Sequence, residues 1–333
     1  MKNLFITSAF LIVLFASCDN NDSNSTPAEL NLVTSSNTSG KVTYTNLLAT
    51  MPTVKSYTVS SADAEGISYN VETDEIIIAS RTNNRLETYS GLKTAFTEGT
   101  DNLMLTLNSI TGEFSNARET AISGDKIVVT QDQSTSNGMI NKLFVYQKTT
   151  TGFTLMKTYI TDFKLWGIHM DGADLYAVAD LTGDIVQFKN FMTNASGNIS
   201  ATKRVTIASL TRTHGITYSA SDDVMILTDV ASATSATDGG LVIIKNFASV
   251  FASTATSGTI ALTNQVRVYG PNSLLGNPVD VAYDSVTKNI YVAERLNAGG
   301  QVLTYSYPTT SGDFAPINVR AEAGVTSIFV LRK

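Results

Sequence analysis

Hydrophobic and polar positions alternate in short runs along most of this chain, and the runs recur in the same order. Residues 66–90, GISYNVETDEIIIASRTNNRLETYS, form one unit in which an apolar run, a polar turn, a second run, a polar loop and a third run follow one another. Short alternating or β-branched runs bounded by Gly, Asn, Asp and Ser are typical of β-strands. The chain is therefore predicted to be all-β and built from repeats.

The repeat can be followed from residue 30 to the end of the chain. Five units each predict four strands, and their first strands are at 66–69, 119–122, 167–170, 215–218 and 280–283. Three further strands have no first strand before them, at 30–35, 40–44 and 54–59, whereas a first strand at 324–331 has nothing after it. We expect the C-terminal strand to join the three N-terminal strands in a single blade. The prediction is a six-bladed β-propeller, closed by the C-terminal strand joining the N-terminal blade, which leaves no open edge at the seam.

Several units resemble a known family. The segments that carry the resemblance are EIIIASRTNNRLETYS, LYAVADLTGDIVQF and NIYVAERLNAGGQVLTYS. They resemble NHL repeats and the wider group of TolB-like six-bladed propellers, over nearly all of residues 30–333. The sequence NPVDVAY at 277–283 also looks like the start of a blade in NHL-type bacterial surface lipoproteins of unassigned activity. The resemblance implies a propeller fold and no particular chemistry.

The N-terminal region has the pattern of an export signal. An apolar run at 4–16 follows Lys2 and has the length of a signal-peptide core, too short for a transmembrane helix. The sequence LFASC that ends at Cys18 resembles a bacterial lipobox, although Phe15 departs from its pattern. Since Cys18 is the only cysteine, we expect it to be lipidated; an ordinary signal peptide with an incidental Cys18 is the alternative.

These patterns predict three segments and a location. Residues 1–17 would be a lipoprotein signal peptide, 18–29 a flexible polar tether, and 30–333 a single propeller domain. The acidic residues after Cys18 resemble the surface-export signals of Bacteroidetes lipoproteins. We therefore expect an outer membrane lipoprotein of the cell envelope, periplasmic or surface-exposed, that contacts the membrane only through its lipid anchor.

Composition narrows the classes of partner and activity. The net charge is −6, whereas a protein that binds nucleic acid through its phosphates needs a basic surface, so nucleic acid is not expected as a partner. The sequence contains no phosphate-binding loop, zinc-binding HExxH helix or GxSxG nucleophile elbow. With a single cysteine there can be no disulfide within the chain, so the β core must supply the stability.

The positions just before and at the start of the first strands form the candidate site, because in a propeller they meet at one mouth of the central channel. The charged or aromatic side chains there are Glu65, Arg118, Glu119, Trp166, His214 and Asp280, and the last blade contributes Ala323 and Gly324. An aromatic face with a few convergent polar groups is the usual content of a ligand site. We expect a protein, glycan or small-molecule ligand at this channel-mouth face. The plainer interpretation is that strand ends are polar because their backbone must be solvated.

Two catalytic interpretations stay open. Glu65, Glu119 and Asp280 could ligate Ca²⁺, and gluconolactonase-like and paraoxonase-like propellers carry a comparable central calcium, which would imply a lactonase or esterase. The pattern departs from theirs, because Arg118, Trp166 and His214 stand where Asn side chains would be expected around the ring. His214 could act as a general base, although no Ser or Cys nucleophile at a recognisable spacing accompanies it. We expect a non-catalytic binding or scaffold module without a cofactor; a calcium-dependent hydrolase, lactonase or lyase is the alternative.

Other recurring polar residues are expected to be structural. Asp132, Asp180 and Asp229 each follow a second strand, where an aspartate can accept hydrogen bonds from the backbone of its own turn. His169 falls inside a first strand and is expected in the core or in the channel wall, satisfied by a hydrogen bond.

Overall fold

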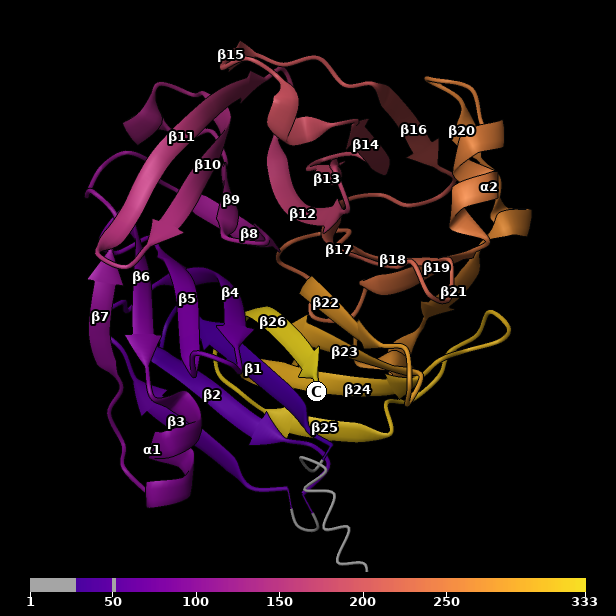
Figure 1. Cartoon of the computed structure of the whole chain (residues 1–333). Helices are drawn as coiled ribbons and strands as arrows, with labels where there is room; N and C mark the ends of the chain where they lie inside the picture. The colour runs from indigo at the N-terminus through magenta and orange to yellow at the C-terminus, as the bar shows by residue number, and fades with distance from the viewer. Residues whose placement is uncertain (1–27, 50–51) are drawn as a thin grey trace, which may run out of the picture.

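The computed structural model describes residues 28–49 and 52–333, which form six small sheets around a central axis (Figure 1). Cys18 and the predicted signal peptide lie outside the described residues. Each sheet is a blade whose antiparallel strands run outward from an inner strand that lines the axis. No helix of the described part is long and apolar enough to cross a membrane.

The blades share one strand order, which runs from the inner strand outward. The seam blade contains β26 (Val325–Arg332), β1 (Leu30–Ser36), β2 (Lys41–Asn46) and β3 (Val54–Thr58). The second blade contains β4 (Ala64–Asn70), β5 (Glu75–Ser80), β6 (Arg85–Ser90) and β7 (Met104–Asn108). The third contains β8 (Ala117–Ser123), β9 (Lys126–Gln131), β10 (Asn141–Thr149) and β11 (Gly152–Thr161), with the short β15 (Gly197–Asn198) added in parallel.

The remaining blades repeat this order. The fourth contains β12 (Leu165–Asp171), β13 (Asp174–Ala179), β14 (Asp184–Phe188) and β16 (Lys203–Ile207), extended by β20 (Thr259–Ile260). The fifth contains β17 (Thr213–Ser219), β18 (Val224–Asp229), β19 (Gly240–Lys245) and β21 (Val266–Tyr269). The sixth contains β22 (Pro278–Asp284), β23 (Asn289–Glu294), β24 (Gln301–Ser306) and β25 (Asn318–Ala321). The helices α1 (Leu92–Glu98) and α2 (Phe247–Ser253) lie in connections to outer strands.

The hydrophobic core lies between neighbouring blades, and the alternation along each strand explains why. On β5, Ile76 and Ile78 point to one face and pack with the seam blade, while Ile77 and Ala79 point to the other and pack with the third blade. Both faces of the strand are buried, which is why the sequence of β5 is continuously apolar. Burying one such isoleucine side chain stabilises the fold by about 1.5–3 kcal/mol.

The predicted six-bladed architecture and its seam are confirmed. Strand β26 pairs along β1, with Leu32 opposite Val330 and Leu30 opposite Arg332, so the C-terminal strand is the innermost strand of the N-terminal blade. One placement is wrong. The seam blade places Thr326 and Ser327 at the channel-mouth positions in place of Ala323 and Gly324, because β26 begins at Val325 and its pairing with β1 shifts the equivalent positions by three residues.

Each inner strand of the second to sixth blades contains a β-bulge close to its start. In the second blade Glu65 is opposite Ala79 and Ile67 is opposite Ile78, so Gly66 is the extra residue. The blades approach closely at this level: a Cβ on Gly167 would lie 2.2 Å from the carbonyl oxygen of His214 in the next blade. Only glycine fits at this position. Because a bulge shifts the alternation of side chains along the strand, the bulges determine which side chains face the mouth and which face the channel.

Candidate functional site

Three of the predicted site residues form a continuous stack at the channel mouth. The guanidinium carbon of Arg118 lies 4.1 Å from the centre of the Trp166 ring. Trp166 also stacks on His214, with 3.5 Å between ring centres and 5° between the planes. The three side chains come from equivalent positions on the neighbouring strands β8, β12 and β17, so the repeat itself builds the stack. Each stacked contact contributes about 1 kcal/mol.

Glu65, from the same position on β4, adds a carboxylate to this stack. Its Oε1 lies 3.3 Å from Nη1 of Arg81 and 3.9 Å from Nη1 of Arg118. The Glu65 side chain is only 1% exposed, and burial raises its pKa to about 7 although both guanidinium groups act to lower it. We call Glu65, Arg118, Trp166 and His214 the mouth cluster.

Ion pairs extend the mouth cluster into a wider network. Arg118 Nη2 lies 3.3 Å from Oδ2 of Asp132. Lys164 connects that carboxylate to the next, with its Nζ 3.7 Å from Asp132 and 3.2 Å from Asp180. Asp180 also accepts a hydrogen bond of 2.6 Å from Nε of Arg212. Charges of opposite sign therefore alternate across three blades.

His214 is held as a neutral ring inside this network. Its Nε2 lies 3.0 Å from Oδ1 of Asp180, and the residue is 2% exposed. Burial lowers the pKa of His214 to about 4, although Asp180 acts to raise it. Burial alone would raise the pKa of Asp180, but the hydrogen bonds from His214 and Arg212 outweigh it and hold that pKa well below its usual range. The contact is thus a hydrogen bond from a neutral imidazole to a carboxylate.

Glu119 and Asp280 lie apart from the mouth cluster and meet across the channel. The inner strands contact one another in the ring order β26, β4, β8, β12, β17 and β22, which places β8 and β22 on opposite sides. The carboxyl groups of Glu119 on β8 and Asp280 on β22 lie close enough for each to shift the pKa of the other. Glu119 also accepts the N–H of Thr120, whereas Asp280 accepts those of Val281 and Ile328. The pair forms a bar across the channel.

Burial strongly favours the protonated form of this pair. It raises the pKa of Asp280 to about 7, despite two backbone hydrogen bonds that act to lower it. It raises the pKa of Glu119 well above its usual value, and the nearby Asp280 raises it further. Asp280 accepts two backbone N–H groups and Glu119 only one, and N–H donors stabilise the charged form of a carboxylate. Glu119 is therefore the side chain that carries the proton of the pair.

The bar closes the inner end of a cavity of about 390 Å³, which we call the channel cavity. Its walls come from all six inner strands, and it runs from the bar toward the ends of those strands, past His169, Tyr218, Tyr283 and Phe329. None of the mouth cluster lines it. His169 stands in the channel wall, where its sequence position places it.

A calcium ion does not fit the carboxylates proposed for it. Glu65 is engaged by Arg81, while Glu119 and Asp280 already accept backbone N–H groups, and burial raises the pKa of both and so disfavours the charged forms that calcium needs. Among residues 28–49 and 52–333, no group of three or more His, Cys, Asp or Glu side chains is arranged to hold a metal ion. We therefore derive no step through calcium.

The structure thus divides the predicted residues between two places. Glu65, Arg118, Trp166 and His214 lie together at the mouth, and Glu119 and Asp280 lie together inside the channel. Sequence reasoning missed Arg81, Lys164 and Arg212, and it assigned Asp132 and Asp180 to turn capping and not to the ion pairs of the mouth cluster. A signal for three of these residues exists, since Arg81, Asp132 and Asp180 each follow a second strand.

The expected turn-capping role holds for only part of the aspartate set. Asp229 accepts the backbone N–H groups of Thr211, Arg212 and Ala231. Asp180 accepts one such bond, from Leu181, beside its ion pairs. The side chain of Asp132 instead contacts Arg118 and Lys164. The ion pairs are possible because these residues face the next blade.

Comparison with known proteins gives the fold class. No protein-family model matches the chain, and the curated proteins contain no match. A chain of a nidogen/laminin complex is 12% identical with a TM-score of 0.62, covering 91% of this chain and 98% of that one. A 6-phosphogluconolactonase-like protein from Bacteroides fragilis is 11% identical with a TM-score of 0.60, covering 93% and 100%. A protein of unknown function from Bacteroides caccae is 7% identical with a TM-score of 0.58, covering 92% and 100%.

These likenesses define the class of protein and nothing finer. At such low identity they support the shared architecture alone, so the chain is a six-bladed β-propeller. The functions named for the similar structures differ from one another, and propellers in general carry many unrelated activities. Function has to be argued from the site.

Proposed function

We propose that this protein is a lipid-anchored envelope lipoprotein of the NHL-like, TolB-like propeller group that binds an anionic ligand at its channel-mouth face without catalysis. The observation that carries the proposal is the layering of charge at the mouth. Cationic groups lie toward solvent and their carboxylate partners lie beneath them. The side chains of Arg81, Lys164 and Arg212 are 23%, 26% and 19% exposed, whereas those of Glu65, Asp132 and Asp180 are at most 3% exposed.

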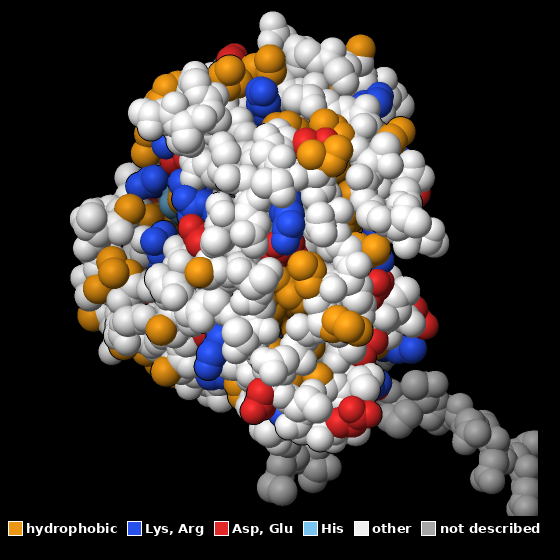
Figure 2. Space-filling view, turned by 90° about the vertical axis from the view of Figure 1, so that its left-hand side faces the viewer, with side chains coloured by type: hydrophobic (Ala, Val, Ile, Leu, Met, Phe, Trp, Pro, Cys, Tyr) orange, Lys and Arg blue, Asp and Glu red, His pale blue; other side chains and the backbone are white. Residues whose placement is uncertain are grey.

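A ligand that approaches this face meets positive groups first. Figure 2 shows Lys and Arg side chains gathered toward its left-hand edge. A guanidinium group has five N–H donors, and the carboxylates beneath use only some of them. Nε of Arg81 and Nε of Arg118 have no hydrogen-bond partner among the described residues, but both atoms are buried. A carboxylate or phosphate group on a ligand could instead take the free donors at the partly exposed ends of Arg81, Lys164 and Arg212.

The same geometry disfavours the alternative, a hydrolase or lactonase. His214 stacks on Trp166 and is only 2% exposed, and its Nδ1, the nitrogen not bound to Asp180, is buried as well, so the ring is poorly placed to activate a water molecule. The alternative is supported by the fold shared with the 6-phosphogluconolactonase-like protein, which is a likeness of architecture. We therefore favour a binding function over a hydrolase or lactonase activity.

Titration of the purified protein with citrate and glucuronate at low ionic strength tests the proposal. Arg212→Ala should weaken binding at least tenfold, because the loss of one desolvated cation contact costs about 1.5–3 kcal/mol. Arg204→Ala is a matched control, since Arg204 also pairs with an aspartate through Nε, at 2.7 Å from Asp184, but on the outer strand β16. Failure of both anions to bind, or equal losses in the two variants, would overturn the proposal.

A further inference from the structure

The channel cavity presents a different chemistry from the mouth. Its lining residues include no Lys or Arg. The acidic bar at its inner end therefore has no cationic partner within the cavity. Of the other titratable groups that face it, His169 on β12 is neutral, because burial lowers its pKa to about 4. Burial also raises the pKa values of Tyr218 on β17 and Tyr283 on β22, so both phenols stay neutral.

Glu65 on β4 is the nearest further acid and acts on the pair from the mouth side. The lining residues of β26 are Ile328, Phe329 and Val330, none of which titrates. The bar holds one negative charge once Asp280 is ionised and Glu119 keeps its proton. That charge lies at the closed end of an otherwise uncharged cavity, where electrostatic attraction is stronger than in water.

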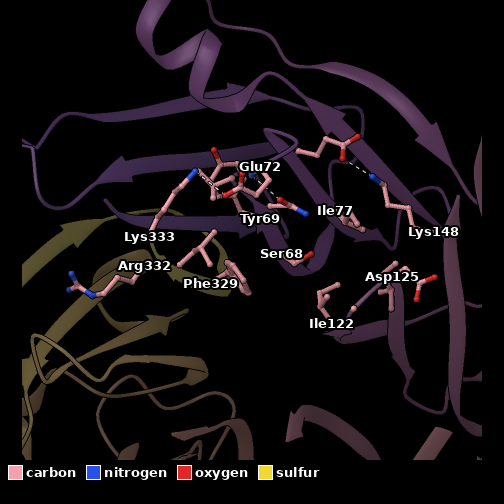
Figure 3. A pocket seen from close by; sticks show the side chains of 16 residues that line it. Ser68, Tyr69, Glu72, Ile77, Ile122, Asp125, Lys148, Phe329, Arg332 and Lys333 are labelled. Atoms are coloured by element: carbon pink, nitrogen blue, oxygen red, sulfur yellow. Dashed lines mark hydrogen bonds and ion pairs between the residues drawn. The ribbon is translucent and has the colours of Figure 1, made fainter. Parts of the chain in front are cut away.

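The cavity also has room and contacts for the body of a ligand. Thr120, next to Glu119, lines the cavity and is 9% exposed, although its hydroxyl oxygen itself is buried. Ser68, Ile122 and Phe329 are shared with an adjoining pocket of about 450 Å³, the side pocket. In Figure 3 the apolar side chains of Ile77, Ile122 and Phe329 lie between two charged rims.

The rims of the side pocket are already neutralised by ion pairs. Lys148 lies 2.6 Å from Glu75, and Lys333 lies 2.9 Å from Glu72 (Figure 3). The two other charged lining residues, Asp125 and Arg332, pair with Lys126 and Asp284. The charges on the rims therefore cancel pairwise, whereas the charge of the bar does not. The strongest uncompensated electrostatic feature that a ligand meets in these two cavities is the single negative charge at the inner end.

From this geometry we propose that the channel cavity is a second ligand site, separate from the mouth cluster, that binds a primary ammonium group carrying an apolar chain. The ammonium group donates N–H bonds to the carboxylates of Glu119 and Asp280, and the apolar chain passes Ile122 and Phe329 into the side pocket. A primary ammonium fits because it offers three donors and a positive charge to two facing carboxylates.

Binding exchanges one cation for another. The ammonium group takes the place of the proton carried by the pair of Glu119 and Asp280, and that proton leaves to solvent, so charge is conserved at the bar. Up to one proton is released per amine bound. The affinity should therefore rise with pH, by up to about tenfold per unit, while the bar is still protonated in the free protein.

Calorimetric titration with hexylamine and with hexan-1-ol tests the proposal. Hexylamine should bind at least tenfold more tightly than hexan-1-ol, with proton release detected as a dependence of the binding heat on buffer. Glu119→Gln should reduce hexylamine affinity at least tenfold, while Glu98→Gln, a change at an exposed carboxylate, should not. Equal affinity for amine and alcohol, or no binding of hexylamine, would overturn the proposal.

Two further variants distinguish the channel cavity from any second place where an amine could bind. Ile122→Trp places a bulky ring at the junction of the two cavities, at a residue that is 38% exposed, and should abolish hexylamine binding while the carboxyl pair is intact. Arg212→Ala, which weakens the mouth, should leave hexylamine binding unchanged. If Arg212→Ala removed amine binding, or Ile122→Trp left it intact, the amine would be bound elsewhere and the proposal would fail, whatever the outcome for anions at the mouth.

Discussion

Replacing Glu119 with Gln should stabilise the folded protein, and by more at pH 7 than at pH 5. Gln has the shape of the protonated acid: its carbonyl oxygen can accept the Thr120 N–H, and its amide can donate to Asp280. It therefore keeps the hydrogen bonds of the bar without a titrating group. The side chain is buried, so solvent screening is small.

The sign and size follow from proton linkage. Burial raises the pKa of folded Glu119 above its unfolded value near 4.5, so its contribution to stability is complete below that pH and is lost as the pH rises. While folded Glu119 keeps its proton, the wild-type protein loses about 1.4 kcal/mol per pH unit relative to the variant. Between pH 5 and pH 7 the difference should grow by about 3 kcal/mol, or about 5 °C in Tm.

Urea and thermal unfolding of both proteins at pH 5, 6 and 7 would measure this. His214, whose pKa is lowered to about 4, changes stability in the opposite direction as the pH falls, but it is present in both proteins and cancels in the difference. Glu98→Gln, at an exposed carboxylate, should show no growing difference. A constant difference between wild type and Glu119→Gln across this range would refute the idea of a protonated bar.

Three further changes test other parts of the structure. Trp166→Ala should destabilise the protein by about 3–5 kcal/mol in urea unfolding, because Trp166 is 6% exposed and supports both Arg118 and His214; a loss below about 1 kcal/mol would contradict the stack. Gly167→Ala should cost about 1–3 kcal/mol, since its Cβ would meet a backbone oxygen of the next blade at 2.2 Å, and a neutral effect on Tm would argue against this blade contact. Cys18→Ser should abolish labelling by radioactive fatty acid and move the protein out of the membrane fraction; labelling that persists would show that Cys18 is not the lipidated residue, and an unlabelled wild-type protein would exclude the lipid anchor.

The strands and their order were predictable because a strand buried on both faces has a continuous run of apolar residues, which is easily recognised in the sequence. The second strands of three blades, Glu75–Ser80, Lys126–Gln131 and Asp174–Ala179, begin and end where the apolar runs do. The seam was predictable too, because three strands without an inner partner and one inner strand without a blade have a single arrangement that leaves no open edge.

The partners of the site residues were not predictable from the same pattern. Glu65 and Glu119 occupy neighbouring positions of the repeat, yet Glu65 turns to Arg81 at the mouth and Glu119 turns into the channel. Successive side chains on a strand point to opposite sides, and a bulge shifts that alternation by one residue. The bulges coincide with the close approach of neighbouring blades, a contact between distant residues that the sequence of one strand does not record.

By itself, then, the sequence determined the strands, the blade count, the closure of the ring and the set of residues that gather near the channel end. Only the tertiary structure decided that Arg118, Trp166 and His214 stack on one another and that Glu119 meets Asp280 from the opposite blade. The physical reason is the separation along the chain of the residues that interact. Strand formation depends on neighbours a few residues away, whereas a contact across the channel joins residues that are brought together only when all six blades have closed the ring.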